Sequence, residues 1–368
     1  MKKNLFFLAA VALTFAACSN DEVVEVNQAD AIDFKPLMTN VTRAADVDIP
    51  TNGFYVTAYS TGTSTTAYFD NVLFSISNSS GTYTSATKYY WPSTYNLDFY
   101  AYSPAAAASS DVVRNSYKTF DITANATVAN QVDFVYANTN NWGKQTGEGT
   151  HDGKPGVTIN FRHAESKVII KLKNTNTTFT CTVGDVTLGY VANTGSFEYK
   201  ASTTDTPNSG TFTETGTWTA NTGTSGVYTQ TVTDGSVYST STAVQAGVDM
   251  ILIPQTLTTA GAYSDAAATS PFNGAYIKVQ LKIQNNGAYI LGDGSSFVTA
   301  LWPLPAGTWE AGKKYIYTVD LAGGGYFETN QDSDSDLDPL LEGAEIKFVT
   351  VTVDNWVETT GIDVTGGI

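Results

Sequence analysis

The chain has 368 residues, of which 12% are aromatic and 15% charged, and its formal net charge is −16. A protein that binds nucleic acid needs clustered Lys and Arg to neutralise phosphates, so this charge balance argues against nucleic acid as a partner. The 21 Tyr and 31 Gly residues favour strands and turns over helices. We therefore predict an all-β fold.

The N-terminus has the pattern of a bacterial lipoprotein signal peptide. Lys2 and Lys3 precede an apolar stretch, residues 5–17, which is too short to cross a bilayer as a stable anchor. Small residues come directly before Cys18, as they do where such signals are cut and the cysteine is acylated. We expect residues 1–18 to form this signal and the acyl chains on Cys18 to anchor the mature protein. An ordinary signal peptide that happens to contain a cysteine is the alternative.

Residues 19–45 combine a polar tether with one short strand candidate. Ile32 and Phe34 would share one face of that strand, whereas Pro36 suggests a strand end or a sheet edge.

Arg43 follows this strand candidate and is one of only three arginines, the others being Arg114 and Arg162. Its neighbours Thr42 and Ala44 are small and give a protease easy access. We predict cleavage between Arg43 and Ala44, and the alternative is that Arg43 is a surface charge without a function. Arg114 falls in a predicted loop and Arg162 in a predicted strand, so cutting should favour Arg43 over Arg114.

Two sets of strand patterns follow, separated by turn-rich segments. The first set fills residues 46–156 and the second begins at residue 157, after a Gly- and Asn-rich stretch at 138–156. We expect two tandem β-sandwich domains, residues 46–156 and 157–368. The Thr-rich stretch at 199–244 has no clear strand pattern.

Alternation of apolar and polar residues predicts which strand faces are buried. In the segment 167–173, Val168, Ile170 and Leu172 should face inward and the three lysines outward. In the segment 97–102, Leu97, Phe99 and Ala101 should be opposed to Asp98, Tyr100 and Tyr102.

No catalytic or metal-binding motif stands out, so we predict no enzyme, no cofactor and no metal site. The two histidines, His151 and His163, lie in a Gly-rich segment and at a strand entrance. Cys181 has the setting of a small buried residue. The acidic segment 332–338 fails the EF-hand pattern because Pro339 stands where the loop needs Gly, and calcium binding there stays open.

The order of several motifs resembles the fimbrillin family, the subunits of type V pili of Gram-negative anaerobes. The motifs are the lipobox at Cys18, Thr42-Arg43-Ala44, Tyr90-Trp91-Pro92 before "LDFYAYSP", "INFRHAESKVIIKL" and "LPAGTWEAGKKYIYTVDL". The resemblance implies two transthyretin-like β-sandwich domains and passage to the cell outer membrane as a surface-exposed lipoprotein. Asp21 and Glu22, just after Cys18, resemble a signal for export to the outer face.

The resemblance further implies that an arginine-specific protease removes the first strand and that a neighbouring subunit fills the resulting groove with a strand of its own. Here the leaving segment would be residues 30–43, with Ile32 and Phe34 filling the groove. The candidate donor strand is "IKFVTVTVDNWV", which carries Ile346, Phe348, Val349, Val351 and Val353. Its alternative is an ordinary last strand of the C-terminal domain.

We therefore expect a structural or adhesive subunit that joins the fimbrium after processing and assembles by donor-strand exchange. Its expected partners are other pilus subunits, an arginine-specific protease and the outer membrane, with a host protein or glycan as a further candidate. The alternative is a surface lipoprotein that does not polymerise and binds glycans or host proteins through its loops. The assignment to stalk, tip or anchor stays open.

Overall fold

The computed structural model describes residues 31–38, 53–63, 65–76, 82–104, 111–143, 156–200, 216–220, 226–238, 242–258, 274–321, 326–327, 338–339 and 350–355. These residues form strands and one short 3₁₀ helix, η3 (Val128–Asn130), with no α-helix among them. The predicted all-β fold is confirmed. Within the same residues, no helix is long and apolar enough to span a membrane.

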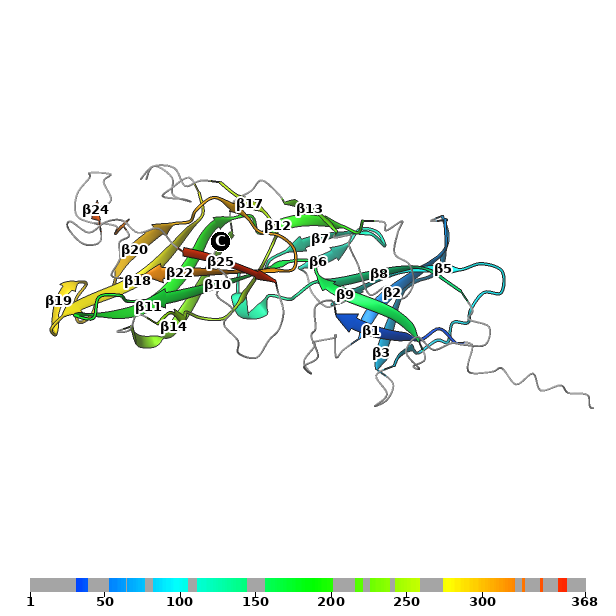
Figure 1. Ribbon diagram of the computed structural model, residues 1–368, viewed down its shortest axis with the longest axis horizontal. Helices are drawn as coiled ribbons and strands as arrows, with labels where there is room; N and C mark the ends of the chain where they lie inside the picture. The colour runs from blue at the N-terminus through cyan, green and yellow to red at the C-terminus, as the bar shows by residue number, and fades with distance from the viewer. Residues whose placement is uncertain are drawn as a thin grey trace, which may run out of the picture.

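The molecule is elongated, with a closed barrel at one end and larger sheets at the other (Figure 1). Seven strands form the barrel. In spatial order they are β1 (Phe34–Met38), β4 (Tyr83–Ser85), β3 (Ala67–Ile76), β2 (Phe54–Ser60), β5 (Leu97–Ser103), β8 (Val135–Trp142) and β9 (Val157–His163). The barrel closes because β1 pairs with both β4 and β9.

A four-stranded sheet lies next to the barrel and joins segments far apart in the sequence. It consists of β13 (Thr217–Ala220), β12 (Thr194–Glu198), β7 (Thr119–Thr123) and β6 (Val112–Arg114). A two-stranded sheet pairs β17 (Thr256–Leu257) with β21 (Gly307–Thr308).

Two larger sheets share one hydrophobic core at the other end of the molecule. The five-stranded sheet contains β15 (Val244–Gln245), β10 (Ser166–Lys173), β22 (Lys313–Asp320), β25 (Thr350–Asn355) and β16 (Met250–Leu252). The seven-stranded sheet contains β14 (Gly226–Tyr238), β11 (Phe179–Val191), β18 (Tyr276–Asn285), β20 (Val298–Pro303), β23 (Tyr326–Phe327), β24 (Asp338–Pro339) and β19 (Ala288–Leu291).

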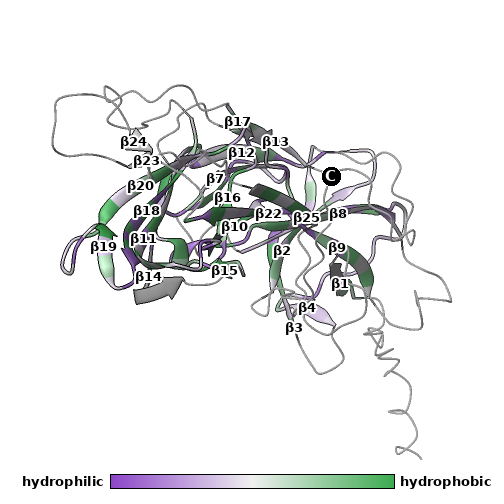
Figure 2. Ribbon diagram, turned by 60° about the vertical axis from the view of Figure 1, so that its left-hand side comes forward, coloured by the Kyte–Doolittle hydropathy of each residue, from purple (hydrophilic) through white to green (hydrophobic). Residues whose placement is uncertain are grey.

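Alternating hydropathy explains why these segments pair as half-buried strands, and Figure 2 shows both colours along the strands of the seven-stranded sheet. Val168, Ile170 and Leu172 of β10 are buried in the core, as predicted. Lys167 differs from the prediction, because it is only 7% exposed and its ammonium lies 3.3 Å from a carboxylate oxygen of Asp249.

Strand β5 has two buried faces. Leu97, Phe99 and Ala101 point into the barrel core, as the alternation predicts. Tyr100 and Tyr102 on the other face are also buried, because they belong to the core shared with the neighbouring sheets. The barrel and the four-stranded sheet therefore pack on opposite sides of one strand.

The expected domain boundary at residue 157 falls at the start of β9, which is a barrel strand paired with β8 and β1. The chain leaves the barrel after β9 and enters the five-stranded sheet at β10. The four-stranded sheet mixes β6 and β7, from before residue 157, with β12 and β13, from after it. Strand pairing thus links the two predicted halves.

Candidate functional site

The candidate site is β1 and its place in the barrel wall. Five residue pairs align β1 in parallel with β9, from Phe34 opposite Val157 to Met38 opposite Phe161. On its other side β1 has one residue pair with β4, Phe34 opposite Tyr83. Within the described residues, β1 is therefore paired over its whole length with β9 and at a single position with β4.

Backbone hydrogen bonds fix the entry of β1. The Ile32 N–H donates to the Tyr89 carbonyl at 2.8 Å, and the Val157 N–H donates to the Asp33 carbonyl at 2.7 Å. An isolated bridge pairs Ala31 with Tyr90. These contacts set which side chains of the segment point inward.

Ile32 and Phe34, the predicted groove-filling residues, are both buried in the barrel core. The Phe34 ring meets Phe74 and Phe54 edge to face, with centroids 4.7 and 5.9 Å apart. Pro36, two residues further along the same face, is also buried. Without β1, the aromatic rings of β2, β3 and β5 would lose the residues that cover them.

Asp33 places a carboxyl group in this apolar setting, and it was not among the site residues that the sequence predicted. Its Oδ1 atom is buried, and none of the described residues donates a hydrogen bond to it. Burial raises the pKa of the carboxyl above its ordinary value, an effect that Lys88 opposes through its positive charge. A buried carboxylate oxygen without a hydrogen bond weakens the segment that carries it.

The predicted lipidation residue Cys18 and the predicted cleavage residues Arg43 and Ala44 lie outside the described residues. The other two arginines are described. Arg162 lies in β9, as predicted, and donates to the side-chain oxygen of Asn138 at 2.6 Å. Arg114 was predicted to lie in a loop, and this is wrong: it ends strand β6 and pairs with Asp70.

The candidate donor segment is described in part. Ile346, Phe348 and Val349 lie outside the described residues, whereas Val351 and Val353 belong to β25. This strand pairs antiparallel with β22 at the edge of the five-stranded sheet. Val351 packs against the core, and Val353 is 51% exposed. The described part of the segment, β25, is thus paired within the five-stranded sheet of its own chain.

The other residues considered for catalysis or metal binding lie in surroundings that indicate a structural role. His163 Nδ1 lies 2.7 Å from Asp133 Oδ2, near the end of the barrel. Cys181 is a buried free thiol whose pKa burial raises to about 12. Among the residues with described positions, no group of three or more His, Cys, Asp or Glu is placed to hold a metal ion. His151 and most of the acidic segment 332–338 are not among those residues.

Comparison with known proteins shows which proteins have a similar fold. A search of curated protein sequences found no match. The structure is similar to a fimbrial protein from Bacteroides vulgatus, with a TM-score of 0.51 and 13% identity, covering 89% of this chain and 100% of that one. At this identity the likeness concerns the fold.

Two proteins from Porphyromonas gingivalis also align over most of their length. The tip fimbrial protein Mfa3 gives a TM-score of 0.37 at 10% identity, covering 88% of this chain and 100% of that one. The fimbrial anchor protein Mfa2 gives 0.28 at 8% identity, covering 89% and 97%. The family model described as fimbrillin-like matches residues 42–356, and the chain therefore belongs to the fimbrillin-like family.

Proposed function

We propose that this protein is a pilus subunit that is exported as a surface lipoprotein, matured by cleavage after Arg43 and assembled by strand exchange. Its family is fimbrillin-like, and the Bacteroides vulgatus protein with the same fold is a fimbrial protein. The lipid on Cys18 would hold the precursor at the outer membrane until it is cut.

The observation that carries the proposal is the pairing of β1. This strand closes the barrel with five residue pairs to β9 and one to β4. Its loss would leave two unpaired strand edges and an apolar trough lined by Phe54, Phe74 and Phe99. Unpaired backbone groups beside an apolar trough form a binding site for an extended segment, which restores the ladder and fills the pockets with alternate side chains.

The donor in this proposal is the segment 346–355 of a neighbouring subunit. Its described part, β25, has one neighbour among the described strands, β22, so leaving that sheet breaks this one ladder. Val351 and Val353 lie on one face of the strand and would enter the positions that Ile32 and Phe34 vacate.

The test is digestion of the full-length precursor with an arginine-specific endoprotease, which avoids the 16 lysines that trypsin would also cut. We expect one main product that starts at Ala44, followed by ladders that resist SDS. Arg43→Gln should abolish both the product and the ladders. Substituting Val351 and Val353 with Asp should keep the product and abolish the ladders.

A chain that stays whole under these conditions, or that is cut and keeps β1 as a monomer, contradicts the proposal. That second result is what a surface lipoprotein that binds glycans or host proteins without polymerising would give. Binding of the uncut monomer to a glycan array would then identify its partner.

A further inference from the structure

Arg114 lies where a folded protein is usually open to proteases. It ends β6, which is the edge strand of the four-stranded sheet, and a tight turn leads from it into β7. The Asn115 N–H donates to the Thr119 carbonyl at 2.9 Å across this turn. Val113, next to Arg114, is 51% exposed. Exposed hairpin ends with polar residues are preferred sites of nicking.

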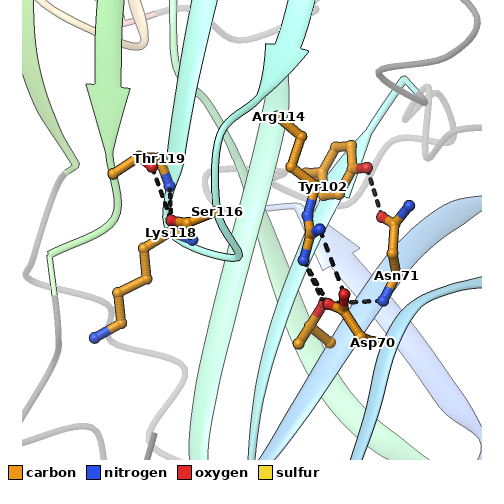
Figure 3. A network of polar contacts seen from close by, with 8 residues as sticks. Asp70, Asn71, Tyr102, Arg114, Ser116, Lys118 and Thr119 are labelled. Atoms are coloured by element: carbon orange, nitrogen blue, oxygen red, sulfur yellow. Dashed lines mark hydrogen bonds and ion pairs between the residues drawn. The ribbon is translucent and has the colours of Figure 1, made fainter. Parts of the chain in front are cut away.

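The side chain of Arg114 is nevertheless held by the barrel (Figure 3). Its Nη2 atom lies 2.5 Å from Asp70 Oδ1 and 3.2 Å from the Thr57 hydroxyl oxygen. Its Nη1 atom lies 3.5 Å from the second oxygen of Asp70. The side chain is only 19% exposed.

The barrel presents these acceptors in a fixed geometry. Thr57 donates its hydroxyl to Asp70 Oδ1 at 2.7 Å, and its oxygen accepts the Asn71 N–H at 3.0 Å. Asn71 has a positive φ of 52° at an irregular position in the β2–β3 pairing, and its side chain accepts the Tyr102 hydroxyl at 2.6 Å. Side chains from three barrel strands, β2, β3 and β5, thus form one binding site for the guanidinium.

We propose that Arg114 is a latent cleavage site, masked because its guanidinium is bound by Asp70 and Thr57. This inference rests on the proposed processing by an arginine-specific protease. Such a protease must take the arginine side chain into its own acidic pocket, and Asp70 competes for the same group. Hydrolysis would consume one water and split the Arg114–Asn115 amide into a carboxylate and a new amino terminus.

Masking matters because cutting after Arg114 would separate strands β2–β5, which remain after maturation, from β8 and β9. A mature subunit nicked there would have a barrel in two pieces. By binding the Arg114 guanidinium, Asp70 and Thr57 therefore restrict proteolytic processing to Arg43, although the chain contains a second arginine at a sheet edge.

The test compares the full-length chain with Asp70→Asn in the presence of an arginine-specific endoprotease, with products identified by mass spectrometry. We expect the original chain to be cut after Arg43 and the variant to be cut after Arg114 about fivefold faster than the original, because proteolysis of a folded chain follows the population of the opened state. Asp98→Asn is the matched control. Asp98 is a barrel carboxylate that accepts from Thr61 and from the Asn141 N–H, whereas the hydrogen bonds of Arg114 go to Asp70 and Thr57. This variant should therefore be cut after Arg114 at the rate of the original chain.

Arg162 reports whether the barrel stays folded, because it lies in β9 and its side chain is held on the outer face of the barrel by Asn138 of β8 and by the Tyr136 ring, 4.6 Å away. If Asp70→Asn also exposes Arg162, Thr57→Val decides: faster cutting at Arg114 with Arg162 intact supports the proposal, and no acceleration overturns it. Equal rates at Arg114 in the original chain and in Asp70→Asn overturn it as well. An uncut Arg43 beside an unmasked Arg114 would contradict the proposed maturation and leave this inference standing.

Discussion

Phe34 of β1 and Phe99 of β5 meet edge to face inside the barrel, with ring centroids 5.1 Å apart and ring planes at 89°. The two strands are not neighbours in the barrel wall, so the contact spans its interior. The strand that is proposed to dissociate thus contributes a side chain to the core of the barrel from which it dissociates.

Phe34→Ala should destabilise the precursor by roughly 3–5 kcal/mol, because a buried ring would be replaced by a cavity. The same substitution should not change the stability of the chain after cleavage and loss of β1. Denaturant unfolding of the two forms measures both effects.

Leu73→Ala, in the same barrel but with a side chain 41% exposed, is the control and should change stability little. Equal destabilisation of the uncut and the cut chain by Phe34→Ala would show that β1 stays in place.

Asp33→Asn should tighten the hold of β1 at neutral pH. The pKa of Asp33 is raised in the folded chain above its ordinary value of 3.8. The fold therefore favours the protonated acid, and stability falls as pH rises from 3.8 through the raised pKa. Asparagine removes this loss.

The measurement for Asp33 is the rate at which the peptide containing β1 leaves after cleavage. It should be slower in Asp33→Asn than in the original chain at pH 7, and the two rates should converge below pH 3.8. Asp185→Asn, in β11 of the seven-stranded sheet, should not alter the release. A release rate that Asp33→Asn leaves unchanged at pH 7 would argue against a role for this carboxylate.

Glu165→Gln should flatten the pH dependence of stability. Glu165 lies in the connection between β9 and β10, and its carboxylate accepts the Phe134 N–H at 2.9 Å. Burial raises its pKa well above the ordinary value of 4.5, so stability falls as pH rises above that value. Glutamine keeps an acceptor for Phe134 and carries no charge.

Glu165→Ala is the matched comparison, since it removes the charge and also leaves the Phe134 N–H unpaired. The unpaired donor alone should cost about 1–3 kcal/mol. Urea unfolding between pH 4 and 8 separates the two variants. A steep pH dependence that survives in Glu165→Gln would assign it to other groups.

Cys181 should be inert in the folded chain. It is buried in β11, and burial raises the pKa of its thiol to about 12, so little thiolate forms at pH 8. Labelling with a thiol reagent at pH 8 should follow the unfolding curve in denaturant. Rapid labelling without denaturant would contradict the buried position.

The sequence predicts the features that depend on period and local chemistry. Alternation places Ile32 and Phe34 on one face, and both are buried. It also places Leu97, Phe99 and Ala101 inward. The pairing of β1 with β9 could not be read in the same way, because it joins residues more than 100 positions apart and no local pattern encodes a parallel partner.

Arg114 was misplaced for a related reason. The short segment "VVRNSYK" has turn residues around it, and its strand character comes from pairing with β7 and from an ion pair to β3. Tyr100 and Tyr102 looked like the polar face of a strand, and a second sheet buries them. Tertiary contacts decided each of these cases.

The peptide bond after Arg43 determines how readily β1 can return to its place beside β9. While that bond is intact, β1 is held near its place at an effective concentration on the order of millimolar. After the cut, the same contacts join two separate molecules, and a peptide that diffuses away rebinds at a negligible rate. If the peptide keeps a lipid on Cys18, it stays in the membrane while the barrel departs. One cut would thus make the exchange irreversible and free the subunit from the cell surface.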